Sequence, residues 1–384
     1  MRRIYLDHAA TSPLLPEVRE AMLPWLDAGN PSSLHAEGRK AKAVLDEARE
    51  TLSDALGCLF AEVLFTSGGT EGANLALIGA AIQNLDASRT RILISSAEHH
   101  CVLQSGPALE ALGYTVELLP VDGEARVDLD FLSQTLDDRV LLVSAMHANN
   151  ELGTLNAVTE IAERAHGHGA LYHCDAVQTF GKKLPGLDDP FPKLTRLPVD
   201  LLTVSAHKLG GPKGTGAIFI RAGVKLKPLI AGGGQEREVR GGTENVSGIV
   251  GFAAAVRAAT ARKTSDSVNP RDVFLSSLVE AGFVPTVESR ETTLSGHAHL
   301  RLPGVDAETM LIRLDREGVS ASSGSACSSG SVEPSHVLLA CGYSAAESKE
   351  GLRFTFGFET SLAEAEEAAR RTILVGQQVK AQRS

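Results

Sequence analysis

The chain has 384 residues, 43% hydrophobic and 22% charged, and its 47 acidic and 37 basic residues give a net charge of −10. This balance argues against nucleic acid or an anionic membrane as the main partner, and the length predicts more than one core. No apolar run is long enough to span a membrane, and Asp7 and His8 interrupt the start, so we expect neither a membrane span nor a signal peptide.

The five cysteines are few, widely spaced and odd in number, and none forms a Cys-x-x-Cys pair: Cys58, Cys101, Cys174, Cys327 and Cys341. This pattern favours a reducing compartment over a disulfide framework, and it is not a zinc signature. We therefore expect a cytoplasmic protein.

Two helices are predicted first, over 16–27 and 35–57. Strands and helices then alternate: strands at 62–67, 90–96, 114–120, 139–147, 170–175, 199–206 and 215–220, with helices at 70–82, 101–113 and 159–169. Alternation with short connections predicts an α/β fold with a mostly parallel sheet wrapped by helices. Ligands of such sheets bind at the carboxyl ends of the strands.

A helix near 245–262 is expected to leave the sheet. A smaller α+β unit is predicted beyond it, with strands at 297–304 and 351–357 and helices at 306–317 and 361–380. We therefore expect a large domain over 15–255 and a small domain made of 1–14 and 256–384. The Gly/Pro/Ser-rich stretch 29–41 is interpreted as a loop that lies over another part of the molecule.

Unusual polar groups follow several predicted strands. Gly68, Gly69 and Thr70 follow 62–67, where small residues and a helix start can bind an anion, although a plain strand–helix turn is the commoner meaning of such a motif. Asp175 ends another apolar strand, where it caps a helix or pairs with a protonated ring nitrogen.

Lys208 directly follows the strand 199–206 and precedes a glycine-rich turn. A desolvated lysine there has a lowered pKa and can form a Schiff base, although a single lysine is more often simply exposed. Ser205 and His207 flank it and can bind an anion, whereas Lys213 lies in the looser part of the turn and is the weaker candidate.

Glu98, His99 and His100 follow the strand 90–96. Their spacing is no zinc signature, and an imidazole stacked on a flat ring and available for proton transfer fits better than a metal site. No metal is expected.

One ligand suits these groups together. Pyridoxal phosphate needs a lysine for its aldehyde, an acid for its ring nitrogen and an anion pocket for its phosphate. Lys208, Asp175 and the turn at 68–70 supply these roles. Gln178 or Asn150 can hydrogen-bond the ring oxygen or the substrate.

A family resemblance runs over nearly the whole chain from Ile4 onward. Its motifs are "YLDHAATSP", "GNPSSLHAEGRKA", "FTSGGTEGANLA", "AEHHCVL", "MHANNELGTL", "YHCDAVQTFGK", "SAHKLGGPKGTGA", "RGGTENV", "SSGSACSSGSVEPSHVL" and "LRFTFG". The chain thereby resembles the cysteine desulfurases of the NifS/IscS group, within the class V aminotransferases. This implies a homodimer of the fold-type I pyridoxal-phosphate architecture, with a seven-stranded sheet in the large domain.

The resemblance also implies a role for each matching residue. The cofactor is held by Gly69, Thr70, His99, Asp175, Gln178, Ser205, His207, Lys208 and, from the other subunit, Thr243. Among these, Lys208 forms the Schiff base, His99 stacks on the ring, Asp175 pairs with the ring nitrogen and Gln178 with the ring oxygen. Asn150 and Arg353 hold the substrate carboxylate, Arg353 by a two-point contact.

The implied reaction takes sulfur from L-cysteine and leaves L-alanine. Lys208 removes the Cα proton, the Cys327 thiolate attacks the substrate sulfur and becomes a persulfide, and His99 is a hypothetical proton carrier. The persulfide then passes to an acceptor protein, which serves iron–sulfur cluster assembly, transfer-RNA thiolation or another thio-cofactor, so that Cys327 is at most a transient cluster ligand. No direct nucleic-acid contact is implied.

Two segments carry further expectations. Cys327 lies in the serine-rich stretch 320–338, which we expect to be poorly ordered so that its thiol can travel. Residues 181–198 look longer than the usual family connection and are interpreted as an inserted surface loop.

Rival functions remain open at this stage. Another class V enzyme, such as an aminotransferase or a selenocysteine lyase, would use the same cofactor frame, although a plain aminotransferase has no use for a thiol on a mobile loop. A non-catalytic sulfur carrier is the more distant alternative, and intact Lys208, Asp175 and Cys327 argue against it.

Overall fold

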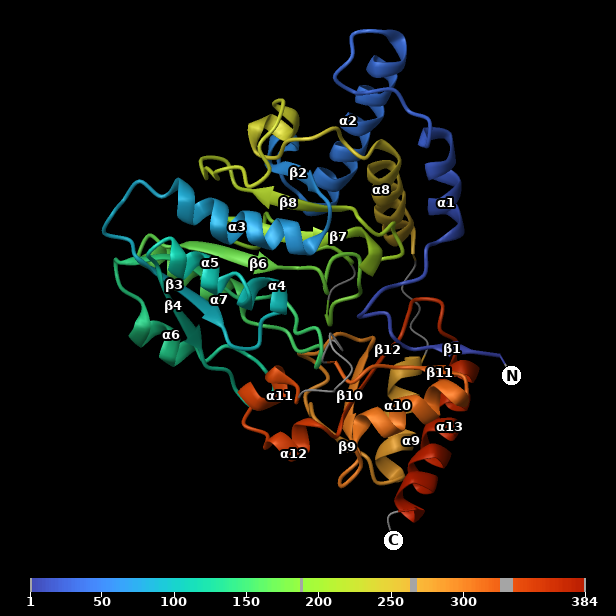
Figure 1. The fold of residues 1–384 in the computed structure, drawn as a ribbon. Coiled ribbons are helices and arrows are strands. Elements are labelled where there is room, and N and C mark those ends of the chain that lie inside the picture. The colour runs from blue at the N-terminus through green and yellow to red at the C-terminus, as the bar shows by residue number, and fades with distance from the viewer. Residues whose placement is uncertain (1, 187–188, 263–267, 325–333, 383–384) are drawn as a thin grey trace.

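The computed structural model describes residues 2–186, 189–262, 268–324 and 334–382. Its central feature is a seven-stranded sheet (Figure 1), with strands β2 Val63–Thr66, β3 Arg91–Ser95, β4 Thr115–Leu119, β5 Val140–Ser144, β6 Leu171–Asp175, β7 Leu201–Ser205 and β8 Gly216–Ile220. The strand order is β2-β8-β7-β6-β5-β3-β4. Only β8 runs antiparallel to its neighbours, so the prediction of a mostly parallel α/β sheet is confirmed.

Helices cover both faces of this sheet: α1 Pro16–Met22, α2 Ala36–Leu56, α3 Gly69–Gln83, α4 His100–Leu103, α5 Gly106–Ala111, α6 Leu129–Thr135, α7 Val158–Gly167 and α8 Val246–Ala261. Successive strand residues belong to different apolar clusters. In β7, for example, Leu201 packs on the side of α3, whereas Leu202 packs with α2 and α8. Because both faces are buried, these strands read as continuous apolar runs.

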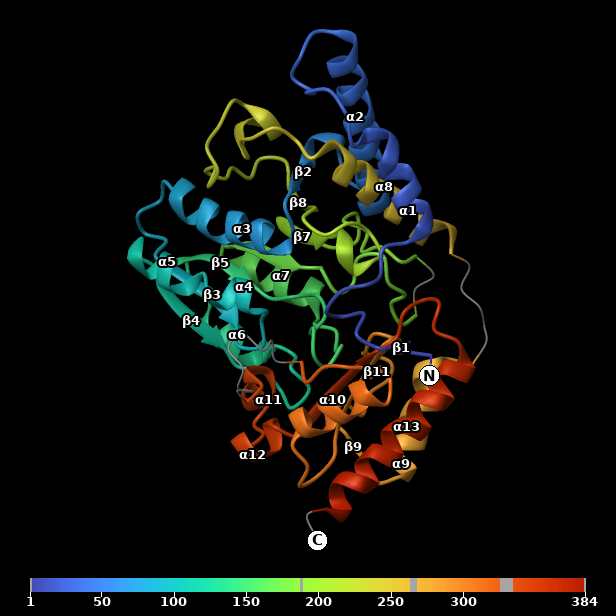
Figure 2. The same cartoon turned by 45° about the vertical axis from the view of Figure 1, so that its right-hand side comes forward.

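A second unit lies below the large sheet in Figures 1 and 2. Its elements are β1 Ile4–Tyr5, α9 Pro270–Glu280, β9 Val284–Pro285, β10 His297–Arg301, α10 Ala307–Arg316, β11 Val319–Ser320, α11 His336–Ala340, α12 Ala345–Ser348, β12 Gly351–Thr355 and α13 Leu362–Ala381. An antiparallel sheet of order β12-β10-β9 and a parallel β1-β11 pair organise it. Its apolar cluster joins Ile4 and Leu6 to residues between Phe274 and Val379. These separate clusters support the predicted domain division, which stays a prediction.

The predicted helix 101–113 is wrong in one respect, because the segment forms two short helices, α4 and α5. Pro107 lies in the first turn of α5, where its missing N–H and fixed φ suit a helix start and not a helix interior. Pro24 likewise ends α1 at Met22 and begins a 3-10 turn.

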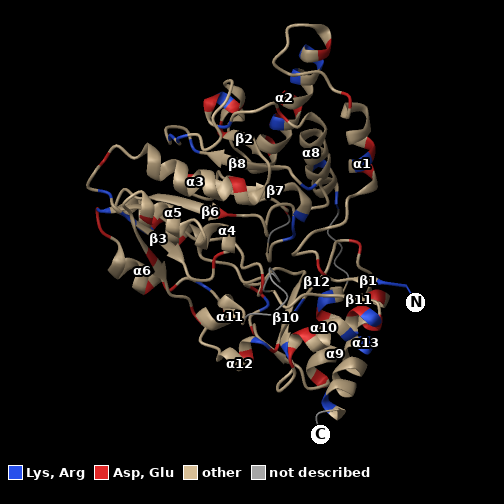
Figure 3. Cartoon of the chain, in the orientation of Figure 1, with Lys and Arg blue, Asp and Glu red and all other residues tan. Residues whose placement is uncertain are grey.

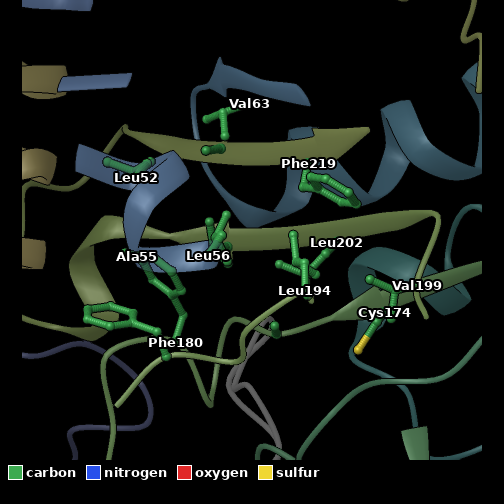
Figure 4. Close-up of a cluster of buried hydrophobic side chains, with 14 of the residues drawn as sticks. Leu52, Ala55, Leu56, Val63, Cys174, Phe180, Leu194, Val199, Leu202 and Phe219 are labelled. Carbon is green, nitrogen blue, oxygen red and sulfur yellow. The ribbon is translucent and has the colours of Figure 1, made fainter. Parts of the chain in front are cut away.

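The interpretation of 181–198 as a surface loop is correct only in part: Lys183, Thr195 and Arg196 are exposed, but other residues of the segment are not. Phe191 and Leu194 are buried, and Figure 4 shows Leu194 in one cluster with Leu56 at the end of α2. The Leu194 N–H donates to the Leu56 carbonyl at 2.7 Å, and Lys193 Nζ donates to two further carbonyls of that last turn. The segment therefore caps α2 and completes the large core.

What the stretch 29–41 lies over stays a prediction, because only its packing on the first turn of α2 is described. It leads into α2, whose N-cap is His35, and Leu34 is 90% exposed. Figure 3, which colours the ribbon by residue type, shows charged residues on outer helices such as α13, while the strands of the large sheet are mostly uncharged. Among the described residues, none of the helices is long and apolar enough to cross a membrane.

Candidate active site

Lys208 lies at the end of β7, in a 3-10 turn over Ala206–Lys208. Its Nζ donates hydrogen bonds to the carbonyl oxygens of Ala9 at 2.5 Å and Ala10 at 2.9 Å. Burial lowers the pKa of Lys208 to about 8, and the positive charge of Arg353 adds to this effect. Lys213, in the same turn, is exposed. The geometry thus favours Lys208 as the reactive amine, as the sequence predicts.

Asp175 lies at the end of the neighbouring parallel strand β6 and is 6% exposed. Burial raises its pKa to about 6, while a hydrogen bond from the Val177 N–H at 2.8 Å and the charge of Lys208 favour the carboxylate. Gln178 follows in the same turn, where its Nε2 donates to the Ala9 carbonyl at 3.1 Å. Lys208 and Gln178 therefore share one main-chain acceptor.

The predicted anion turn connects β2 to α3, so Gly69 and Thr70 form the first turn of a 15-residue helix. A Cβ at Gly69 would lie 2.9 Å from Val177 Cγ2, so only glycine allows this close approach of backbone to the strand ends. Ser205 is 2% exposed, and its Oγ has no hydrogen-bond partner in the described structure. A helix N-terminus beside an unpaired buried hydroxyl suits a phosphate group.

His207 and His99 are both neutral in this arrangement. His207 Nδ1 lies 3.1 Å from Thr11 Oγ1, and burial lowers its pKa to about 4. His99 is the N-cap of α4, and its Nδ1 accepts from the Cys101 N–H at 3.1 Å, so its proton is on Nε2. Burial, then the charge of Lys208, lowers the pKa of His99 to about 4. His99 therefore keeps an N–H donor at Nε2.

Arg353 belongs to β12 and reaches the site from the second unit. Its Nη2 donates to Asp7 Oδ1 at 2.9 Å and its Nη1 to the Asn150 carbonyl at 3.0 Å, while its buried Nε has no partner among the described residues. Asn150 Oδ1 is also buried and unpaired there. The free Arg353 Nε–H is a donor that suits a carboxylate, whereas the free Asn150 Oδ1 is an acceptor that suits an N–H or O–H group.

Glu151, next to Asn150, is buried and contacts both ends of the segment that the structure leaves undescribed. Its Oε2 accepts from Ser335 Oγ at 2.6 Å, and a Cβ at Gly324 would lie 2.6 Å from the same oxygen. Cys327, the predicted nucleophile, and its expected mobility lie outside the described residues. The described ends of this segment nevertheless start beside Asn150 and Arg353.

Other predicted features lie apart from this site or cannot be tested within one chain. Thr243 is exposed in the loop before α8, and its predicted contact with the phosphate of a second subunit stays a prediction. Across the described ranges, no group of three or more His, Cys, Asp or Glu side chains could hold a metal ion. Glu98 is completely buried, and burial raises its pKa well above the usual range.

Several residues of the site escaped the sequence reasoning: Asp7, Ala9, Ala10, Glu151 and Lys182. Their motifs, "YLDHAATSP", "MHANNELGTL" and "YHCDAVQTFGK", were noticed. The acid in the first motif, isolated after an apolar run, is the signal that could have indicated Asp7. Main-chain acceptors such as the Ala9 carbonyl have no sequence signal.

A lysine and an aspartate at adjacent strand ends, facing the N-terminus of α3 in a seven-stranded α/β sheet, define the large-domain architecture of the fold-type I transferases. Comparison with known families agrees, since a family model described as "Aminotransferase class-V" matches residues 4–367. The chain belongs to this family, and within it to the cysteine desulfurases.

Three similar proteins illustrate this membership. A relative from Dictyoglomus turgidum named "Cysteine desulfurase IscS" is 43% identical, covering 94% of this chain and 91% of its own length. A solved "NifS-like protein" has a TM-score of 0.89 at 32% identity, covering 98% of this chain and all of its own. The structure "SspA in complex with cysteine" has a TM-score of 0.80 at 33% identity, covering 92% and 98%.

Proposed function

We propose that this chain is a pyridoxal-phosphate-dependent cysteine desulfurase that converts L-cysteine to L-alanine and keeps the sulfur as a persulfide on Cys327. The observation that carries the proposal is the joint placement of Lys208 and Asp175 beside the unpaired hydroxyl of Ser205. Names of relatives that cover nearly the whole chain support the same activity.

The residues present fit the cofactor. Ser205 Oγ and Asn150 Oδ1 are buried polar atoms without partners in the described chain, which costs free energy unless a ligand completes them. We assign the phosphate to Gly69, Thr70, Ser205, His207 and, from a second copy, Thr243. Asp175 would hold the ring nitrogen, Gln178 the ring oxygen and His99 one face of the ring. When bound, the cofactor supplies an electron sink for the substrate Cα.

The protein's own groups then divide the remaining work. Arg353 and Asn150 hold the substrate carboxylate, which fixes the Cα–H toward the Lys208 amine. Because the pKa of Lys208 is lowered to about 8, a useful fraction of the amine is free base near neutral pH and can take this proton. His99, with its proton on Nε2, can return a proton to the substrate.

The sulfur step needs a thiolate. Cys327 Sγ attacks the substrate sulfur, an S–S bond forms, and the carbon–sulfur bond breaks with its electron pair remaining on the carbon fragment. That fragment takes up protons and leaves as alanine. Gly324 and Ser335, on either side of the undescribed segment, lie beside Glu151, which is next to the proposed substrate residue Asn150.

Partners and location are part of the proposal. Exposed Leu23, Leu26 and Leu34 at the start of the large unit support a homodimer, which would also bring in Thr243. An acceptor protein for the persulfide is required by the chemistry, because the sulfur must leave Cys327 before the next turnover. A cytoplasmic location would keep this thiol reduced. The division into 15–255 and the two flanking segments is likewise proposed.

The test compares Cys327→Ser with Cys341→Ser, a partly buried cysteine whose pKa burial raises to about 12. Cys327→Ser is expected to abolish sulfide and alanine formation from L-cysteine while keeping the visible absorption of the bound cofactor. Cys341→Ser is expected to keep both. Sulfide release by Cys327→Ser would overturn the role of Cys327, and a protein that stays colourless with added cofactor would favour a non-catalytic sulfur carrier.

A further inference from the structure

Lys182 is a buried amine that neither the sequence motifs nor the proposed reaction uses. It lies in the turn after β6, four residues beyond Gln178, and its Nζ donates to Gln178 Oε1 at 3.0 Å. Although the residue is partly exposed, burial of its amine lowers its pKa to about 7, and the charges of Lys208 and Arg353 contribute. Burial near two other cations disfavours the charged form of this amine, so its hydrogen-bond partner must offset that cost.

The contacts of Gln178 indicate that Lys182 helps to orient the Gln178 amide. A side-chain amide has an oxygen that only accepts and a nitrogen that only donates. The Gln178 nitrogen faces the Ala9 carbonyl, which can only accept, and its oxygen faces the Lys182 amine, which donates in either protonation state. A flipped amide would set oxygen against the Ala9 carbonyl and its N–H₂ against the amine. The Ala9 carbonyl therefore fixes this orientation at every pH, and the Lys182 amine adds to it most strongly while it is protonated.

The fixed orientation leaves one N–H of Gln178 for a ligand. The amide nitrogen has two N–H donors, and one is used by Ala9. Lys208 Nζ donates to the same carbonyl, so the amide nitrogen of Gln178 lies near the amine that would carry the cofactor. The chain of contacts runs from Lys182 through Gln178 and Ala9 to Lys208.

We propose that Lys182 is a positioning residue that locks the Gln178 amide so that its free N–H faces the ring oxygen of the bound cofactor. This inference rests on the proposed function, because it requires the cofactor to be held at Lys208. A hydrogen bond donated to the ring oxygen favours its ionised form. Lys182 thereby sets the pH at which the bound cofactor takes up a proton.

The test is a pH titration of the visible absorption of the bound cofactor without cysteine, so that it does not depend on turnover. Lys182→Met removes the donor and is expected to raise the midpoint by roughly half to one pH unit, which corresponds to one lost hydrogen bond. Lys183→Met, at the exposed neighbouring lysine, is the matched control and should leave the midpoint unchanged.

A double-variant comparison separates positioning from a simple charge effect. In a Gln178→Ala background, Lys182→Met should cause no further shift, because there is no amide left to orient. An equal shift in that background would overturn the proposal, since it would show that the Lys182 charge acts directly on the ring. An unchanged midpoint in Lys182→Met alone would overturn it as well.

Two further variants keep the test decisive if Lys182→Met does not fold. Lys182 lines a cavity of about 640 Å³, so Lys182→Arg has room and keeps a donor, and Lys182→Gln keeps an N–H donor without the charge. Both should titrate like the unmodified protein, and midpoints shifted as in Gln178→Ala would contradict the proposal. If the unmodified protein itself shows no visible band with the cofactor, the proposed function fails and not this inference alone.

Discussion

The two sheets of the molecule place their polar residues differently. In the large sheet both faces are buried, and its mid-strand polar groups satisfy one another: His173 lies 2.8 Å from Ser144 Oγ and 3.0 Å from Thr203 Oγ1. Lys208 and Asp175 occur only where strands end. A sheet that is buried on both faces can present reactive side chains to a ligand only at the ends of its strands.

The small antiparallel sheet is also buried on both faces, but only one of its faces is apolar. In β12, Leu352 and Phe354 pack into the second apolar cluster, whereas Arg353 points the other way and faces its register partner His299 in β10. The buried Nε2 atoms of His297 and His299 have no partner in the described chain. The polar face of this sheet is thus a wall of the candidate site. Under the proposed function, the large sheet would supply the cofactor groups from its edge and the small sheet a substrate group from its face.

The largest effect is expected from a substitution at a strand end of the large sheet. Lys208→Ala should lower the rate of alanine formation from L-cysteine by roughly 10³-fold or more, because it removes both the cofactor anchor and the base. Lys213→Ala, at the exposed lysine of the same turn, is the matched control and should keep the rate. Equal losses in both variants would show that the turn matters as a whole and not the strand-end amine.

An intermediate effect is expected from substitutions on the two faces of β12, which can be compared with each other. Arg353→Met should lower kcat/KM for L-cysteine by roughly 10- to 100-fold, mainly through KM, because charge-assisted bonds to the carboxylate are lost. Leu352→Ala, one residue away but in the apolar cluster, should instead lower the free energy of unfolding by about 2–5 kcal/mol. Steady-state kinetics and denaturant unfolding measure the pair. A KM rise in Leu352→Ala, with its stability intact, would contradict the division of faces.

The smallest effect tests whether the two sheets influence each other. The pKa of Lys208 is lowered to about 8, first by burial and then by the charge of Arg353. The neutral, reactive amine of the folded protein therefore increases as the pH rises through about 8. In Arg353→Met the burial remains and the charge is lost, so the midpoint for cofactor capture by the apoprotein should move upward, by less than about one pH unit. An unchanged midpoint would show that the sheets are electrically independent.

The sequence predicts the large sheet well because a strand that is buried on both faces is apolar throughout, and such runs separated by turns are visible in the sequence. It also predicts Lys208 and Asp175, since a strand end is a position along the chain. Residues 181–198 could be interpreted only in part, because the burial of Leu194 depends on the end of α2, far away in the sequence.

The roles of two further residues could not be predicted for the same reason, because each depends on a contact that the sequence does not identify. Asp7 acquires its role from Arg353, 346 positions away, and Lys182 from the orientation of a neighbouring amide. The alternation of polar and apolar residues in "HAHLR" and "GLRFT" is visible in the sequence and predicts strands with one apolar and one polar face. The polar wall of the site could therefore have been predicted from these two strands.

Residues 6–9 lie alongside β12: the Thr355 N–H donates to the Leu6 carbonyl at 2.7 Å, and the Ala9 N–H donates to Thr355 Oγ1 at 2.8 Å. The Ala9 carbonyl that receives Lys208 is therefore fixed by a strand that the ribosome makes more than 340 residues later. The large sheet can form during synthesis, but the hydrogen bond of Lys208 to the Ala9 carbonyl cannot be fixed until β12 has been synthesised. Under the proposed function, cofactor capture is therefore expected only after β12 has been synthesised.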